Sequence, residues 1–381
     1  MTAIYVFSFL MDITIVFLML GLNFRAVDLG ASPAQLGVLQ ASFAVPYTLL
    51  CFFLARRLSL LDARVSITVS SLLLLILSVL SGILSSLASF ILLGVLIGAV
   101  TAFFWPPLEH YLGRGKPANQ LYPILSRFNL WWCSGYAVAT ATCGLLYRWK
   151  LLNVRLPFLV AAACLVPIIA RTPFLHSQHS PQGNHAAPTT PTAETATPIH
   201  RKKFFLTTAR VFIFLTYASA GCIFALFPKL GDALRLGKPL VSHIIFFLYL
   251  GQLLSFYILG RTRRWHYNLP LLVMGQAFIA AAFLAVFLSN HTAVIAGAFA
   301  VVGFASGLTY FSSLYYTLHE PVFRSSLAGV HEALLASGRL IGPLFCGAIA
   351  GAFNLKIPYL FLACIFALFA LHTLLQSRRC T

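Results

Sequence analysis

Residues 328–353 read AGVHEALLASGRLIGPLFCGAIAGAF. The stretch is apolar and long enough to cross a lipid bilayer, which takes about 20 helical residues. It nevertheless carries Glu332 and Arg339, whose spacing of two helical turns places both charges on nearly the same helix face. A charge inside a membrane helix is costly and usually faces protein or a water-filled cavity. The stretch therefore predicts a membrane helix whose polar stripe faces an aqueous pathway; a structural ion pair with another helix is the alternative.

Small residues recur along the same stretch at Gly338, Gly342, Gly347 and Gly351, and Pro343 directly follows the second of them. Small residues spaced by one turn let a neighbouring helix approach closely in lipid. We therefore expect this helix to be tightly packed against its neighbours.

The composition of the whole chain extends this reading. Of its 381 residues, 60% are hydrophobic and only 9% are charged, against about 25% charged in soluble proteins. The net charge of +18 comes from Lys and Arg in short loops between apolar runs, so it follows the positive-inside rule and does not predict a nucleic-acid partner. The composition predicts an all-α, polytopic protein of the cell (inner) membrane, with the lipid bilayer as its partner and both termini cytoplasmic.

Twelve apolar runs are long enough to span the membrane. They cover residues 3–24, 33–54, two runs within 66–113 divided at 85–89, then 122–147, 156–172, 204–228, 239–259, 269–288, 292–317, 328–353 and 357–376. The seventh run is expected to end at Pro228, because proline removes a backbone donor and disrupts a helix interior.

Residues 173–203 differ from the rest of the chain because they are rich in Pro, Thr, Ser and His. Such a segment cannot bury enough apolar surface to order itself. We expect a flexible cytoplasmic linker there, between an N-terminal six-helix bundle at 1–172 and a C-terminal six-helix bundle at 204–381.

The two predicted bundles also contain matching sequence. The pairs Ser-Gly at 134–135 and Cys-Gly at 143–144 recur 203 residues later, at 337–338 and 346–347. These pairs fall in the fifth helix of each half. Two six-helix repeats of this kind predict a transporter whose site lies at their interface.

At this point the sequence resembles the major facilitator superfamily, over essentially its whole length. The motifs that carry the resemblance are WPP at 105–107, the FN..W..G run at 128–135 and HEALLASGRLIGP at 331–343. The basic loop LARRLSLLDARV at 54–65 lacks the ordered glycine and aspartate of the family motif. The resemblance implies alternating access of two six-helix halves, with the first, fourth, seventh and tenth helices lining a central cavity. It predicts a secondary active transporter of a small organic solute.

Two charges are expected near the middle of the membrane. Asp12 lies about ten residues into the first helix and Arg339 about ten residues into the eleventh. Burial and a nearby cation act in opposite directions on the proton affinity of a carboxylate, so Asp12 suits proton coupling. We predict proton-coupled symport, in which Arg339 binds an anionic substrate group or pairs with Asp12. A fixed structural partner for Asp12 is the alternative.

Further polar residues lie near the inner helix ends. Glu109, Arg127 and Glu332 are predicted to form part of a cytoplasmic gate along the substrate and proton pathway, and the repeat places Asn129 opposite Glu332. Snorkelling into the lipid headgroups is the alternative for the charged side chains.

Hydroxyl groups on the seventh and tenth helices are candidates for contact with the substrate. These are Tyr217, Thr309 and Tyr310. Hydroxyls in helices also bond to their own backbone, which is the alternative interpretation.

The sequence holds no nucleotide-binding loop and no cysteine–histidine cluster, so we expect no cofactor, no metal site and no enzymatic activity. Two other classes stay open. One is a receptor or scaffold that keeps the fold without transporting, which a filled apolar centre would favour. The other is a membrane enzyme acting on lipid, for which no clustered catalytic set is present.

Overall fold

The structure, a computed structural model, describes most of the chain. The described residues are 2–58, 61–113, 118–149, 153–175, 199–262, 264–318 and 324–378. Their regular secondary structure consists of α1 (Thr2–Asp28), α2 (Pro33–Leu58), α3 (Ala63–Ile83), α4 (Leu87–Thr101), α5 (Trp105–Gly113), α6 (Ala118–Leu146), α7 (Leu156–Arg171), α8 (Ile199–Ala233), α9 (Lys238–Leu259), α10 (Leu269–Leu288), α11 (Thr292–Leu318), α12 (Arg324–Ala352) and α13 (Ile357–Ser377), with 3-10 turns η1 (Asn153–Arg155) and η2 (Thr172–Phe174).

The predicted all-α membrane fold is confirmed. Within the described ranges, eleven segments are long and apolar enough to cross a membrane, and α4 and α5 together make one of them, Leu87–Leu112. The twelfth predicted span is α6, which has 29 residues. Polar residues such as Asn129 and Thr140 lower the hydropathy of this helix. They are buried inside the protein, because α6 packs against α1 and α9.

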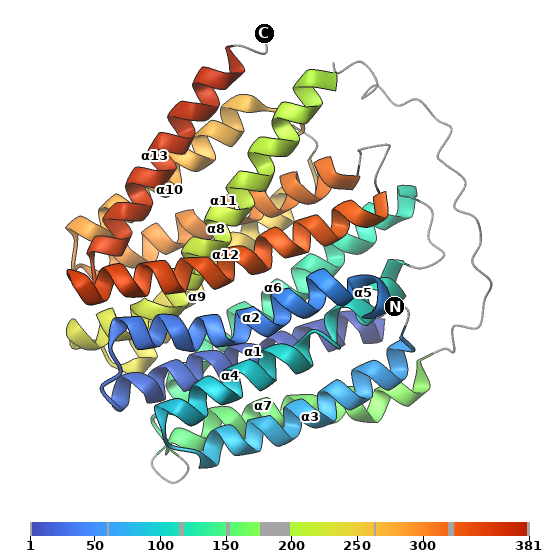
Figure 1. Cartoon of the computed structure of the whole chain (residues 1–381), viewed down its shortest axis with the longest axis vertical. Coiled ribbons are helices and arrows are strands. Elements are labelled where there is room, and N and C mark those ends of the chain that lie inside the picture. Colours follow the sequence, from blue (N-terminus) through green and yellow to red (C-terminus); the bar gives the residue numbers. More distant parts are fainter. Residues whose placement is uncertain are drawn as a thin grey trace.

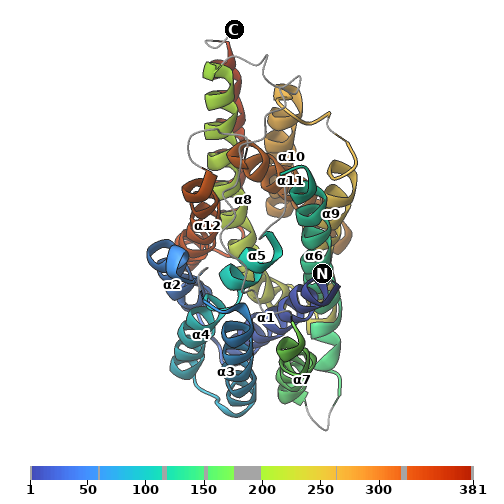
Figure 2. The ribbon, with the colours of Figure 1, turned by 90° about the vertical axis from the view of Figure 1, so that its right-hand side faces the viewer.

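The helices form two groups that lie one above the other in Figure 1, α1–α7 below and α8–α13 above. We call the end of the bundle where α1 begins the terminal end, and the end that holds the α1–α2 and α8–α9 turns the turn end. Figure 2 views the molecule onto the terminal end. The two halves meet where α2 packs on α12, α6 packs on α9, and α1 packs on α8.

The glycines of α12 pack as the sequence predicts. A Cβ atom on Gly342 would collide with the Ala218 carbonyl of α8, and one on Gly347 would lie 2.8 Å from the Pro33 carbonyl of α2. Close approach to two neighbours fixes α12 between its own half and the other.

The repeat is visible in the same contacts. In the first half, Gly135 of α6 meets the Phe9 carbonyl of α1; in the second, Gly338 of α12 meets the Phe214 carbonyl of α8. The glycines 203 residues apart in sequence therefore make equivalent contacts. The two halves are built by the same helix packing.

The predicted end of the seventh span at Pro228 is wrong, because α8 continues through this proline to Ala233. Proline at 228 leaves the Phe224 carbonyl without its helical donor. The side-chain amide of Asn23 on α1 donates to that carbonyl instead, at 3.2 Å. Another helix thus satisfies the freed group, which is how membrane helices tolerate proline.

The predicted linker also has different edges. Residues 172–174 form η2, and α8 begins at Ile199, so residues 199–203 are helical rather than part of a linker. Residues 176–198 lie outside the described residues.

Candidate functional site

Two adjoining cavities lie between the halves of the bundle. The cavity nearer the turn end has a volume of about 400 Å³, and the cavity nearer the terminal end has a volume of about 730 Å³. Both volumes include space that is open to solvent. Residues from both halves line both cavities, and Arg339 belongs to the lining of each. The guanidinium therefore lies where the two cavities meet.

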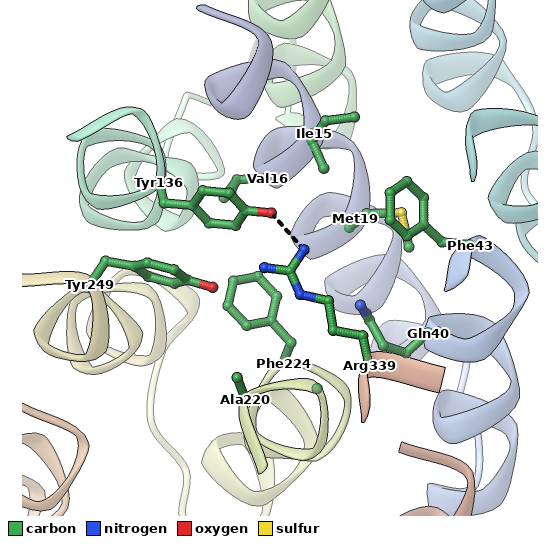
Figure 3. Close-up of a pocket in the computed structure, with 11 residues that line it drawn as sticks. Ile15, Val16, Met19, Gln40, Phe43, Tyr136, Ala220, Phe224, Tyr249 and Arg339 are labelled. Atoms are coloured by element: carbon green, nitrogen blue, oxygen red, sulfur yellow. Dashed lines mark hydrogen bonds between the residues drawn. The ribbon is translucent and has the colours of Figure 1, made fainter. Parts of the chain in front are cut away.

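Arg339 projects from α12 among aromatic side chains of both halves (Figure 3). Its guanidinium donates a hydrogen bond to the Tyr136 hydroxyl at 3.5 Å, a long distance for such a bond. It lies 5.0 Å from the ring centre of Tyr217 and 5.8 Å from that of Tyr136, within range of cation–π attraction. Aromatic rings rather than a carboxylate surround this half-buried cation.

Asp12 lines the cavity nearer the terminal end and is only 4% exposed. Its Oδ2 atom has no hydrogen-bond partner among the described residues. Asp12 and Arg339, both described, are not joined by an ion pair in this conformation. Asp12 and Arg339 thus line one cavity without neutralising each other directly.

The close packing around Asp12 comes from the repeat glycine of α6. The Asp12 Cβ atom would lie 3.2 Å from a Cβ placed on Gly135. The carboxylate is near enough to Tyr136, Cys133 and Arg339 to interact electrostatically with each. Only a small residue at position 135 lets α6 lie this close to the carboxylate.

The predicted gate residues that the structure describes lie in different surroundings. Glu109 on α5 lines the cavity, whereas Arg127 on α6 is exposed. Asn129 is 1% exposed and accepts a hydrogen bond from the Trp132 indole at 3.0 Å. The side chain of Glu332 lies outside the described residues. Asn129 therefore serves the packing of α6 in this conformation.

The histidine next to Glu332 faces its own half. His331 is 1% exposed, and its Nδ1 atom is 2.9 Å from the Ser313 hydroxyl of α11. Its ring contacts that of Tyr310 at 5.0 Å between centres. These contacts connect α12 to α11 within the second half.

The predicted hydroxyl residues divide into two groups. Tyr217 and Tyr310 line the cavity nearer the terminal end. The Thr309 hydroxyl donates to the Ala305 carbonyl of its own helix at 2.7 Å, which is the alternative that the sequence left open.

Sequence reasoning missed most of the aromatic lining. Eight of the sixteen described residues that line the cavity nearer the terminal end are aromatic: Phe43, Tyr47, Trp105, Phe128, Trp132, Tyr136, Tyr217 and Tyr310. The repeat held one signal for them, because Tyr136 stands 203 residues before Arg339.

The turn end is closed by contacts between the halves. Lys238 at the start of α9 forms an ion pair with Asp28 at the end of α1, at 2.6 Å. The Ser242 hydroxyl bonds to the Thr140 carbonyl and accepts from the Gly144 amide, the latter at 3.0 Å. These contacts hold the two halves together at this end of the bundle.

A polytopic helical protein with two related halves around a polar interfacial cavity belongs to the class of membrane solute transporters. Residues 2–322 match the sequence profile of the Major Facilitator Superfamily. The chain belongs to this family of transporters, as the sequence motifs predict. A comparison with curated protein sequences found no match.

Solved transporter structures share the fold along nearly the whole chain. The nucleoside transporter NupG superposes with a TM-score of 0.67 and 15% identity, covering 98% of each chain. The human organic anion transporter MFSD10 gives 0.68 and 14%, again covering 98% of each chain. A bacterial homologue of the human lysosomal transporter Spinster, in its inward-facing and unoccupied conformation, gives 0.65 and 16%, covering 98% of this chain and 97% of its own.

Proposed function

We propose that this protein is a secondary active transporter that carries a small organic solute across the cell (inner) membrane by alternating access, in symport with protons. The observation that supports the proposal is the cavity between the halves, which Asp12 and Glu109 line from one side and Arg339 from the other. Ionisable groups from both halves in one interfacial cavity give a solute and a proton a shared site.

Alternating access is supported by the unequal ends of the bundle. The turn end is held closed by the Asp28–Lys238 ion pair and by Ser242, and the larger cavity lies toward the terminal end. With both termini in the cytoplasm, as the charge distribution favours, this arrangement is an inward-facing conformation. Outward opening then requires the contacts at the turn end to separate.

Proton coupling is assigned to Asp12. The carboxylate is buried, and among the described residues Arg339, Tyr136 and Cys133 are ionisable groups that interact with it electrostatically. Binding of a solute anion to the guanidinium would remove the positive charge that favours an ionised carboxylate, so the carboxylate would take up a proton. The solute and the proton would then cross together.

The polar lining also bears on the rival interpretation. A receptor or scaffold that does not transport has no need of a buried, unpaired carboxylate and a guanidinium in the same cavity. The costs of burying both groups support a function that uses them.

The experiment is uptake into proteoliposomes of a mixed library of metabolites and drugs, with and without an imposed pH gradient. We expect accumulation of one compound class above its external concentration only when the gradient is present. In Asp12→Asn we expect uphill accumulation to be lost, while exchange down a concentration gradient is retained.

Two results would count against this proposal. Gradient-driven accumulation that survives in Asp12→Asn would remove the coupling role of that residue. No movement of any compound by the wild-type protein would favour the receptor or scaffold.

A further inference from the structure

We propose that the site takes an organic monoanion that carries an aromatic ring, with its carboxylate on Arg339 and its ring against the aromatic wall of the cavity. This inference rests on the proposed transport function, because it assigns the solute class of the same site.

The surroundings of Arg339 indicate that the ligand carries a negatively charged group. A guanidinium carries five N–H donors in a fixed fork that matches a carboxylate. Within the described part of the chain, the Tyr136 hydroxyl is its single hydrogen-bond acceptor, at 3.5 Å. Donors that face the cavity are therefore left for a ligand. A neutral sugar would leave the half-buried guanidinium without a counterion.

A continuous aromatic surface that begins next to the guanidinium indicates that the ligand also carries an aromatic ring. The Tyr217 ring lies 5.0 Å from the Arg339 guanidinium and 6.5 Å from the Tyr310 ring, which is 5.8 Å from Trp132. On the side of α5, Trp105 extends this lining. A planar ring finds edge and face contacts along this surface that a saturated ring does not.

The limit to a single negative charge follows from Asp12. This carboxylate lines the same cavity, and Arg339 is the one Lys or Arg among the described lining residues. A second negative charge on the ligand would face the Asp12 carboxylate, so phosphorylated and dicarboxylic ligands are disfavoured. One charge on the ligand suffices to neutralise the guanidinium, while Asp12 carries the transported proton.

The test is calorimetric binding to the purified full-length protein in lipid nanodiscs, which measures the site without requiring transport. The probes are related arylacetates and analogues that vary the ring and the charge. Phenylacetate and naphthylacetate are aromatic monoanions, phenylacetamide lacks the charge, cyclohexylacetate lacks the aromatic ring, and phenylalanine adds an ammonium group on one further carbon. We expect an aromatic monoanion to bind about tenfold or more tightly than the other three probes, which is the scale of one charged hydrogen-bond pair.

Variants connect the binding to the assigned residues. Arg339→Gln should abolish binding, and Arg339→Lys should weaken it about tenfold, because a point charge replaces a two-pronged contact. Arg261→Gln is the matched control, since Arg261 is surface-exposed and contacts the Tyr257 ring outside the cavity. Trp105→Leu should weaken binding and Trp105→Phe should restore it, with Trp149→Leu, 67% exposed in the wild type, as control.

Each contrary result is distinct. Equal binding of phenylacetamide would remove the role of Arg339, equal binding of cyclohexylacetate would remove that of the rings, and tighter binding of phenylalanine would assign a zwitterion instead. No binding of either aromatic acid would overturn the inference, even if other solutes accumulate in proteoliposomes. Binding of an aromatic acid without uptake would uphold the inference and reject the transport proposal.

Discussion

Arg339 donates a hydrogen bond across the two halves to the Tyr136 hydroxyl, and the two residues stand at equivalent positions of the repeat, 203 residues apart. Each directly follows the glycine that packs on the first helix of its half, Gly338 or Gly135. The repeat thus brings corresponding positions together at the interface, and sequence divergence has placed a cation in one and a phenol in the other. The site is asymmetric in chemistry although its scaffold is symmetric.

The ring of Tyr136 should matter more than its hydroxyl. The hydrogen bond to Arg339 is long, whereas the ring stacks on Tyr249 with centres 4.6 Å apart. We expect Tyr136→Phe to change the KM for uptake by less than about threefold, and Tyr136→Leu to raise it about tenfold, since aromatic pairs contribute about 0.5–1.5 kcal/mol. Concentration-dependent uptake measures both variants. Equal effects of the two substitutions would assign the role to the hydroxyl.

The close approach of α12 to α8 makes Gly342 sensitive to any side chain. A Cβ atom there would collide with the Ala218 backbone. We expect Gly342→Ala to cost about 1–3 kcal/mol of stability and to lower Tm in thermal unfolding. Gly297→Ala is the control, because no other group lies within 4 Å of a Cβ at that position. An unchanged Tm for Gly342→Ala would mean that the two helices can separate at no cost.

The bond from Asn23 to the Phe224 carbonyl should stabilise closure of the turn end. Both residues are buried, and the carbonyl has lost its helical donor to Pro228. Asn23→Leu should leave that carbonyl unpaired in the closed conformation, at a cost of about 1–3 kcal/mol. Met19 lines the cavity nearer the turn end. The rate at which a thiol reagent labels the cysteine of Met19→Cys therefore measures how often the turn end opens.

We expect labelling from the turn side to increase about tenfold in the Asn23→Leu background, in line with that cost. Asn290→Leu, an exposed site in the α10–α11 turn, should leave it unchanged. Identical labelling in both backgrounds would show that the amide does not stabilise closure.

The ion pair between Asp28 and Lys238 should have a smaller effect on the same equilibrium. The side chains are 43% and 29% exposed, so the pair is solvated and contributes about 0.2–1 kcal/mol. Lys238→Gln should raise turn-side labelling by less than about fivefold, and high salt should raise that of the wild type in the same direction. Exchange of the two charges in Asp28→Lys with Lys238→Asp should restore the wild-type value; a further increase would contradict a direct pair.

The cap of α3 should add an acid-sensitive contribution to stability. Desolvation opposes ionisation of Asp62, but hydrogen bonds from the backbone and side chain of Arg64 outweigh it and lower the pKa of Asp62 below 3.8. Because the pKa of Asp62 is lower in the folded than in the unfolded chain, its ionised carboxylate stabilises the fold. This contribution to the free energy of unfolding is fully present above the unfolded-state pKa and is lost as the pH falls through the folded-state pKa.

The Asp62 contribution can be isolated with Asp62→Asn, which caps a helix without titrating. We expect the wild-type protein to have the higher Tm near neutral pH, by an amount that shrinks as pH falls from about 5 to about 2. The difference corresponds to less than about 1 kcal/mol, since Asp62 is exposed. A Tm difference that grows as the pH falls would show that folding raises the pKa of Asp62 instead of lowering it.

Much of the scaffold could be predicted from sequence because lipid imposes simple constraints. Apolar runs of fixed length predicted the membrane spans. The glycines at 338 and 342 predicted a closely packed face of α12, which in the structure meets α8. The Ser-Gly and Cys-Gly repeats gave the relation between the halves. Each of these signals is local in sequence, and the backbone contacts that they determine need little knowledge of other side chains.

The cavity lining was less predictable because it depends on which helix faces meet. Charged residues such as Asp12 stand out in an apolar run, whereas Trp132 and Tyr136 are indistinguishable there from packing residues. Pro228 was misread for the same reason: its effect on α8 is offset by Asn23, which lies 201 residues before the carbonyl that it satisfies. Long-range compensation of this kind leaves no local pattern.

The proline of α8 also makes the first helices of the two halves mechanically unequal. The register that matches Phe9 with Phe214 matches Asn23 with Pro228, so α1 carries an intact hydrogen-bond ladder where α8 carries a gap. The gap is filled only while α1 is in place. As the turn end separates, α8 has a point at which it can bend or admit water, and α1 has none there. At this position α8 would thus be the more compliant of the two helices in the proposed motion, and α1 the stiffer one.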